Sequence, residues 1–241
     1  MRLDKMIALT GISRKDAKKI LSSGRVKVNG CVMRDAGANV PDDAEIEIGG
    51  VKADIRKELH IMIYKPAGVL TATEDAHGEK TVLSLLPESL WNRKIGPVGR
   101  LDKDVTGLVI LTTDGQLAHR LISPRWEHEK EYIAQVEGRL DEKCVQAFRE
   151  GIPFKDFTAK PAGLEIIEAA DTQSICRVRV TEGKYHQVKR MLLSVGHPVL
   201  TLHRESIAGI RLDPILEPGQ WRYLTKEETD HFYTITESKP T

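Results

Sequence analysis

Apolar residues at the start of the chain recur three and four positions apart, which is the spacing of helices that bury one face. Between residues 1 and 24 this pattern predicts two short helices, the first with Leu3 and Ile7 on one side. Ser13, followed by Asp16 three residues later, is typical of the start of a second helix. The first segment of the chain is therefore expected to begin as a helical pair.

The period then changes from that of a helix to that of a strand. RVKV (25–28) and EIEI (45–48) alternate between apolar and polar residues, and Asn29-Gly30 is a strong tight-turn signal. The stretch GGVKADIRKELH (49–60) is polar and begins with glycine, so we expect it to be a linker. These patterns predict a small helix-and-sheet module followed by a flexible connection.

Strand and helix patterns are interspersed in the rest of the chain. The expected strands are HIMIY (60–64), GLVILTT (107–113), EYIAQVEG (131–138), SICRVRV (174–180), VLTLH (199–203) and IAGIRL (207–212), with helices at 116–124, 141–151 and 184–196. They lack the regular spacing of parallel βαβ units, so we predict the α+β class with a mainly antiparallel sheet. Two domains are expected, 1–58 and 59–241.

Charge is distributed unevenly although the net charge is only +1. Residues 1–34 carry nine lysines and arginines against two aspartates, a local charge of +7, and residues 177–211 carry +5. Such basic regions in a near-neutral chain indicate nucleic-acid binding, although a lysine-rich helix face facing only water is the alternative. The predicted RNA contacts in the first module are Arg2, Arg14, Lys15, Lys18, Lys19, Arg25 and Lys27.

Several functional classes find no support in the sequence. No run of 18 uncharged apolar residues predicts a membrane helix, and the N-terminus does not have the pattern of a signal peptide, so we expect a cytoplasmic protein. The three cysteines are far apart and form no CxxC pair, which disfavours disulfides and zinc. Phosphate-loop, dinucleotide, nucleophile-elbow and HExxH motifs are absent. We therefore expect no metal and no cofactor.

The segment GRLDKDVTG (99–107) combines charged residues with glycines just before an apolar strand. A loop of this kind can hold a carboxylate rigidly at the edge of a sheet. Taken alone, it is equally compatible with an Asx turn, or with a glycosidase in which Asp102 and Asp104 would be the two carboxylates. The residues by themselves do not choose among these readings.

The same segment resembles the catalytic motif of the RsuA/RluA-type pseudouridine synthases. Three further segments resemble motifs of that family in the same order: KPAGV (65–69), EKEYIAQVEG (129–138) and EGKYHQVKRMLLSVGHPVLTLHRESIAG (182–209). The beginning of the chain, including SRKDAKKILSSGRVKVNG (13–30), resembles the RNA-binding module of the small-subunit ribosomal protein S-four type. Together the resemblances cover nearly the whole chain.

The resemblance implies a role for individual residues. Asp102 would be the catalytic carboxylate, Tyr132 the active-site tyrosine and Lys189 the basic residue of the last motif. Arg100, Leu192, Arg190 and Lys65 would contact the substrate, with Leu192 lining the base pocket. Without the resemblance, Tyr132 could equally be packed on a sheet, and Arg190 could be an exposed helix charge.

The implied reaction is the isomerisation of one uridine in ribosomal RNA to pseudouridine. It breaks the N-glycosidic bond, rotates the uracil and rejoins it through carbon five, and it needs no redox step. An anionic carboxylate could attack the sugar, attack the base or remove a sugar proton, and a cation beside the carboxylate would favour its ionised form. The form HQVKRM (186–191) favours small-subunit RNA. The expected partner is ribosomal RNA or the assembling small subunit, bound by a monomer; a non-catalytic assembly factor and a large-subunit synthase are the alternatives.

Overall fold

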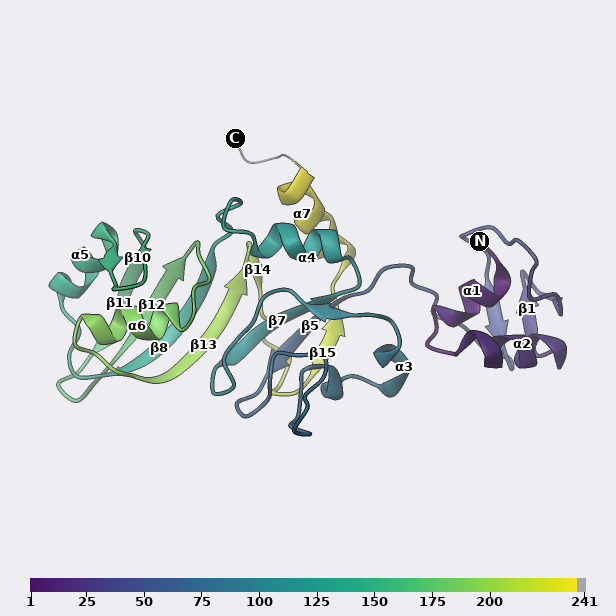
Figure 1. Cartoon of the computed structure of the whole chain (residues 1–241), viewed down its shortest axis with the longest axis horizontal. Coiled ribbons are helices and arrows are strands. Elements are labelled where there is room, and N and C mark those ends of the chain that lie inside the picture. Colours follow the sequence, from purple (N-terminus) through teal and green to yellow (C-terminus); the bar gives the residue numbers. More distant parts are fainter. Residues whose placement is uncertain (238–241) are drawn as a thin grey trace. The chain divides into compact units, whose positions relative to one another are not determined.

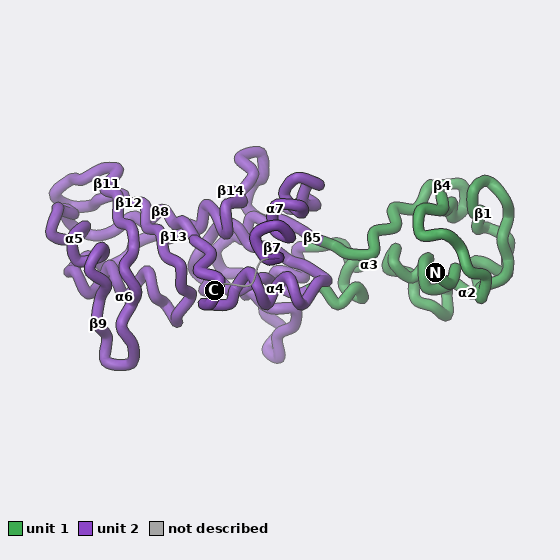
Figure 2. Tube along the Cα trace, turned by 90° about the horizontal axis from the view of Figure 1, so that it is seen from above, with its two compact units in different colours: residues 1–59, 86–95 green, residues 60–85, 96–241 purple. Residues whose placement is uncertain are grey.

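The chain folds into two compact units in a computed structural model that describes residues 1–237. The first unit contains Met1–Leu59 together with Leu86–Ile95, and the second contains His60–Leu85 and Gly96 onward (Figure 2). The sequence predicts a division after residue 58 but gives no sign that residues 86–95 join the first unit. Among residues 1–237, no helix is long and apolar enough to cross a bilayer.

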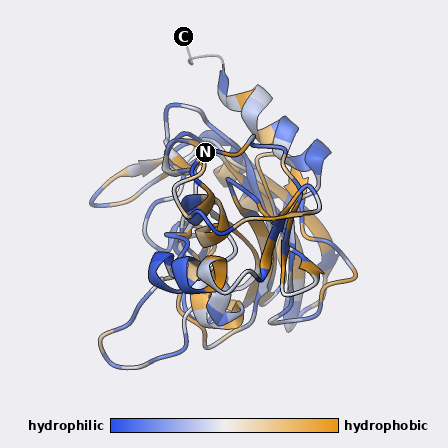
Figure 3. Cartoon of the chain, turned by 90° about the vertical axis from the view of Figure 1, so that its right-hand side faces the viewer, coloured by the Kyte–Doolittle hydropathy of each residue, from blue (hydrophilic) through white to orange (hydrophobic). Residues whose placement is uncertain are grey.

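The first unit packs helices on a small antiparallel sheet. Helices α1 (Leu3–Ala8) and α2 (Arg14–Ser22) lie with a sheet of order β2-β1-β3-β4. The strands are β1 (Val26–Val28), β2 (Cys31–Val32), β3 (Ile46–Ile48) and β4 (Val51–Lys52), and α3 (Glu88–Trp91) also belongs to this unit. The core is made of the buried apolar faces of these elements, among them Leu3, Ile7, Leu21, Val26 and Ile46. Hydrophilic and hydrophobic residues alternate along the helices and strands, as the ribbon coloured by hydropathy shows (Figure 3).

The helix start predicted at Ser13 is present in the structure. The Ser13 side chain accepts a hydrogen bond from the backbone N–H of Asp16, at 3.1 Å, and caps α2. This bond satisfies one of the N–H groups that a helix leaves unpaired at its first turn. Ala17 and Leu21 are buried on the inner side of α2, so its charged residues face solvent.

The predicted linker at 49–60 is wrong for its first residues. Strand β4 lies antiparallel to β3, and the N–H of Ala53 donates to the carbonyl of Ile46 at 2.8 Å. Gly49 and Gly50 both have positive φ, +61° and +89°, and form the two-residue turn of this hairpin. Two glycines between alternating residues are themselves a hairpin signal, which the polar composition of the segment obscured.

A large mixed sheet organises the second unit, as Figure 1 shows. Its order is β11-β12-β8-β13-β7-β5-β15, with β14 paired to β13 and β6 to β7. The strands are β5 (His60–Lys65), β6 (Gly96–Pro97), β7 (Thr106–Thr112), β8 (Lys130–Glu137), β11 (Gly163–Ala169), β12 (Gln173–Val180), β13 (Val199–Ile207), β14 (Ile210–Arg211) and β15 (Trp221–Tyr223). Every pairing is antiparallel except that of β13 with β7. The α+β class and the mainly antiparallel sheet are confirmed.

Helices and a second hairpin complete this unit. They are the 3-10 turn η1 (Leu83–Leu85), α4 (Gly115–Ile122), α5 (Glu142–Glu150), α6 (Gln187–Ser194), α7 (Lys226–Glu237) and the hairpin β9 (Ile152–Pro153) with β10 (Thr158–Ala159). The side chain of Asp114 caps α4, and α4 packs against α7. A buried cluster that includes Met62, Leu108, Leu117 and Phe232 fills the space between sheet and helices. Strand β13 continues past the predicted VLTLH to Ile207, and the strand predicted at 207–212 is present only as the short β14, which forms a hairpin with the end of β13.

Candidate active site

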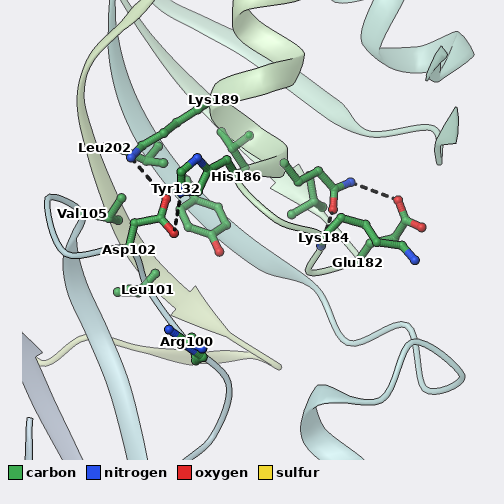
Figure 4. A pocket seen from close by; sticks show the side chains of 13 residues that line it. Arg100, Leu101, Asp102, Val105, Tyr132, Glu182, Lys184, His186, Lys189 and Leu202 are labelled. Carbon is green, nitrogen blue, oxygen red and sulfur yellow. Dashed lines mark hydrogen bonds and ion pairs between the residues drawn. The ribbon is translucent and has the colours of Figure 1, made fainter. Parts of the chain in front are cut away.

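A polar pocket lies where the loop before β7 meets β8, β13 and the start of α6. The loop contributes Arg100, Leu101, Asp102 and Val105, and another wall is formed by Glu182, Lys184 and residues 186–189. Tyr132 comes from β8 and Leu202 from β13, which are neighbours in the sheet. Four segments that are distant in sequence thus meet around the Asp102 carboxylate (Figure 4).

The side chain of Lys65 holds the loop that carries Asp102 through hydrogen bonds. This side chain is completely buried, and its ammonium donates to the backbone carbonyls of Pro66, Lys103 and Val105 at 2.9, 3.1 and 2.6 Å. Burial lowers the pKa of Lys65 to about 8. Lys65, which is predicted to contact the substrate, uses its three N–H groups inside the protein, and the two acceptors in the loop, at Lys103 and Val105, both follow Asp102 in the chain.

Hydrogen bonds between Thr71 and the backbone of Leu101 also hold this loop. The Thr71 hydroxyl donates to the Leu101 carbonyl at 2.8 Å, and the Leu101 N–H donates to the Thr71 hydroxyl oxygen at 3.1 Å. Asp102 follows directly in the chain. Two hydrogen bonds therefore hold the backbone directly before Asp102, and a catalytic carboxylate requires such a fixed position.

Gly107 allows the strand after the loop to lie against β13. Its φ is +110°, and a Cβ atom at this position would lie 2.3 Å from the backbone oxygen of Arg204. The parallel pairing of β7 with β13 consists of Thr106 opposite His203 and Gly107 opposite Arg204. The last residue of GRLDKDVTG (99–107) therefore has a backbone role that any side chain would disturb.

Lys189 is placed between two carboxylates. Its Nζ lies 3.1 Å from Oδ2 of Asp102, and 2.8 and 2.9 Å from the two carboxylate oxygens of Asp104. The hydrogen bond from Lys189 lowers the pKa of Asp104. Burial acts to lower the pKa of Lys189, but its bonds to Asp104 and Asp102 outweigh burial, so that this pKa is raised. The pairing with Asp102 was expected, whereas the sharing with Asp104 was not.

His186 approaches Asp102 from a second direction. Its Nε2 lies 3.4 Å from Oδ1 of Asp102, the oxygen that Lys189 does not contact. His186 is the N-terminal cap residue of α6 and has a left-handed backbone, with φ +50° and ψ +29°. The sequence predicts His186 at the basic start of this helix, but it does not predict that His186 lies beside the carboxylate of Asp102.

The turn that presents His186 is held by a buried pair. Gln187 donates from Nε2 to Oε2 of Glu182 at 3.0 Å, and its Oε1 accepts from the N–H of Lys184 at 3.0 Å. Glu182 and Gln187 are both buried and both line the pocket. This pair is not predicted from the sequence. The only signal for it is the polar residue Gln187 just inside the apolar stripe of the helix.

Tyr132 lines the side of the pocket that the strand β8 forms. Its side chain is 9% exposed, and it pairs in register with Val178 of β12 and Arg204 of β13. In Figure 4 the ring lies beside Asp102 within the same cavity. A ring that is packed on a sheet and still lines a pocket combines both roles considered for Tyr132.

Comparison with known proteins identifies this arrangement. Residues 59–194 match the family model described as RNA pseudouridylate synthase, and residues 1–46 match that of the S4 domain. The chain belongs to the RNA pseudouridylate synthase family. It is 41% identical over 234 residues to ribosomal small subunit pseudouridine synthase A of Escherichia coli, covering 95% of this chain and 98% of that protein. It is 37% identical over 241 residues to an RNA pseudouridine synthase of Aquifex aeolicus, covering 100% and 99% of the two chains.

A solved structure agrees with this membership. A crystal structure of a pseudouridylate synthase superposes with a TM-score of 0.68 at 34% identity, covering 96% of this chain and 99% of that one. The family resemblance read from the four sequence motifs is thereby confirmed, together with the S4 module. The protein is an RNA pseudouridine synthase with an N-terminal S4 domain.

Three other residues predicted to bind substrate differ in their surroundings. Arg100 is exposed and lines the pocket, as expected for a backbone anchor. Leu192, predicted to line the base pocket, is completely buried in α6 and is not among the residues that line this pocket. Arg190 pairs with Asp156 at 3.0 Å, and its guanidinium lies 4.5 Å from the ring centre of Phe154. Arg190 thus attaches the loop between β9 and β10 to α6.

The basic residues of this synthase's S4 domain fall into two groups. Arg14, Lys15 and Lys18 are exposed on α2 and, within residues 1–237, form no salt bridge with a carboxylate. The others are engaged: Arg2 with Asp4, Lys19 with Asp16, Lys27 with Glu47, and Arg25 with the Ser23 hydroxyl. The first group is the part of the predicted RNA contacts that needs no rearrangement.

Proposed function

We propose that this synthase converts one uridine of small-subunit ribosomal RNA to pseudouridine, with Asp102 as the catalytic carboxylate. The observation that carries the assignment is the Asp102 carboxylate at the pocket wall, with Lys189 on one oxygen and His186 on the other. The relatives named for small-subunit RNA support the substrate, because they match the chain over 95% of its length. Ribosomal RNA as substrate also agrees with the cytoplasmic location that we expect.

The target uridine has to leave its stack to reach the pocket. Enzymes that act on a base take it out of the helix, because the reacting atoms are inaccessible within it. Arg100 at the pocket edge is available to the backbone phosphates of the displaced nucleotide. The uracil would then enter between the loop of Asp102 and the sheet floor, with its face on the Tyr132 ring.

The chemistry requires one bond to break, another to form and one proton to move. The N-glycosidic bond opens, the uracil turns within the pocket, and carbon five bonds to the sugar carbon. Carbon five then loses its proton and the freed ring nitrogen gains one, so that the product is an isomer of the substrate. Asp102 acts as an anion at the first stage, by attack on the sugar, by attack on the base or by removal of a sugar proton. Lys189 favours that anion. At the end, the hydroxyl oxygen of Tyr132 would accept the proton of carbon five while its own phenolic proton passes to water.

Mapping of the product tests this function. Separate small-subunit and large-subunit RNA transcripts are incubated with the protein, and pseudouridine is located by carbodiimide-dependent stops of reverse transcription. The proposal predicts one new stop, at a uridine of the small-subunit RNA. A stop in the large-subunit RNA alone would contradict the proposed substrate. If neither transcript reacts, the same assay on partly assembled small subunits decides whether the substrate is a particle, and no stop there would contradict the proposed substrate altogether.

A further inference from the structure

Tyr185 is an aromatic side chain that the fold leaves in water. It is 76% exposed, more than any other aromatic side chain among residues 1–237. It follows Lys184 and precedes His186, both of which line the pocket, although Tyr185 itself does not. An exposed aromatic ring at the rim of a substrate pocket is a feature that the catalytic steps above leave unused.

The ring is nevertheless held in a defined orientation. It stacks on His186, with ring centroids 3.8 Å apart and planes 18° from parallel. His186 is itself anchored, because its Nε2 faces Asp102 at 3.4 Å. A stack of two rings therefore runs from the catalytic carboxylate to the solvent, and its outer face is the free face of Tyr185.

The backbone at this stack is strained. The left-handed φ of His186, +50°, is uncommon for a residue with a side chain. Strain of this kind persists where the surroundings impose it, and it gathers at functional sites. Here the Glu182–Gln187 pair and the Asp102–His186 contact fix the turn from both sides. The structure thus retains an unfavourable conformation that keeps the two rings stacked.

We propose that the free face of Tyr185 is the stacking platform for an unpaired nucleobase next to the target uridine. Single-stranded RNA is bound by aromatic rings on which bases stack, combined with cations that follow the backbone. Lys184 and Arg100 supply such cations at the same pocket. When the uridine leaves its stack, the neighbouring base loses a partner, and Tyr185 would replace that partner. The proposal rests on the pseudouridine synthase activity and adds a subsite to it.

The occupant is inferred to be a base because of the surrounding charge. Lys184 and Arg100 line the pocket and, among residues 1–237, form no salt bridge with a carboxylate, so these two cations are available to an anionic chain. The stacking energy of a base on an aromatic ring depends little on its identity. The subsite is therefore expected to hold the neighbouring nucleotide without selecting strongly for its sequence.

The test uses the full-length protein and the RNA in which the modified uridine has been mapped. 2-Aminopurine, whose fluorescence falls when it stacks, replaces in turn the base on the 5′ side and the base on the 3′ side of that uridine. Binding of the wild-type protein should quench the probe at one of the two positions. Tyr185→Ala should abolish that quenching and raise KM about 10-fold, within the range of one lost stacking contact, while kcat stays within about twofold.

Two further variants make the result specific. Tyr185→Phe keeps the ring and should behave as the wild type, and Trp91→Ala removes another exposed aromatic ring, on α3, and should also leave quenching and KM unchanged. Wild-type quenching and KM in Tyr185→Ala would overturn the proposal, as would a fall in kcat without a change in KM. Equal defects in Tyr185→Ala and Tyr185→Phe would also overturn it, since the hydroxyl group would then be responsible. A wild-type protein that forms no pseudouridine in any substrate would instead contradict the proposed function.

Discussion

The ammonium group of Lys189 lies 2.8 Å from Oδ1 of Asp104 and 3.1 Å from Oδ2 of Asp102, so one cation is shared by two carboxylates two residues apart. Asp104 is 75% exposed and Asp102 is 31% exposed. Water can therefore solvate Asp104 when the cation is absent, but it reaches Asp102 less well. Lys189 should matter more to the function of Asp102, although its shorter contact is with Asp104.

Substitution of Lys189 by methionine tests this sharing. Because the hydrogen bond from Lys189 lowers the pKa of Asp104, the variant should have an Asp104 pKa closer to the ordinary value. The carboxyl group would then take up its proton at a higher pH, which carboxyl-carbon NMR measures directly. We expect kcat to fall about 100-fold, roughly 3 kcal/mol of barrier, because Asp102 loses its cation in a partly closed pocket.

Arg190→Met is the matched control for Lys189→Met. Arg190 is the next residue of α6, but it pairs with Asp156 and not with the catalytic loop. It should leave the titration of Asp104 in place and change kcat by less than about threefold, in keeping with a surface contact. An unmoved Asp104 titration in Lys189→Met would show that the ion pair is not formed in solution.

Lys65 is predicted to be a structural support of the active-site loop. Lys65→Met leaves the buried carbonyl of Val105 without the donor that Lys65 provides, whereas the carbonyl of Lys103 keeps the N–H of Gly68, so we expect a loss of about 2–3 kcal/mol in the free energy of unfolding. Lys103→Met is the control, because Lys103 makes an exposed salt bridge with Glu79 and should cost less than about 0.5 kcal/mol. Urea denaturation measures both, and equal stability of the two variants would contradict the assignment.

The sequence predicted the elements whose signals are local. The hairpin turn at Asn29-Gly30, the cap at Ser13 and the strand after GRLDKDVTG (99–107) each depend on a few neighbouring residues, and each is present. The motifs also identified the family. Strands β11 and β15 and helix α7 were not predicted, because their apolar residues follow no clear period and the elements are stabilised by packing against the sheet and α4.

Apart from the pairing of Lys189 with Asp102, which the family resemblance implied, side-chain partners could not be predicted from the sequence, for a physical reason. Whether Lys65 faces solvent or the interior depends on the path of a loop 38 residues later in the chain. The attachment of Arg190 to Asp156 joins positions 34 residues apart, and that of Lys189 to Asp104 joins positions 85 residues apart. A helix period fixes the side on which a residue lies, but the tertiary fold decides what it meets there.

The free basic residues of α2 should supply part of the RNA affinity. Changing Arg14, Lys15 and Lys18 together to glutamine removes about three phosphate contacts, so the log–log salt dependence of binding should flatten by about two units for single-stranded RNA. A variant with Lys52, Lys57 and Lys160 changed to glutamine has the same change in charge, but these lysines are paired with carboxylates. It should keep most of the wild-type slope, and equal slopes in the two variants would show that charge alone, not its position on α2, sets the affinity.

The most direct test of the account is the rate at which Asp102→Asn forms pseudouridine at saturating RNA, measured in a single turnover beside Asp104→Asn. Both variants remove one carboxylate from Lys189, but only the first removes the proposed catalytic group. We expect normal RNA binding in both variants. The single-turnover rate should fall more than about a thousandfold in Asp102→Asn and less than about tenfold in Asp104→Asn. A rate for Asp102→Asn within tenfold of the wild type would contradict the assignment of Asp102 as the catalytic carboxylate, as would a larger loss of rate in Asp104→Asn than in Asp102→Asn.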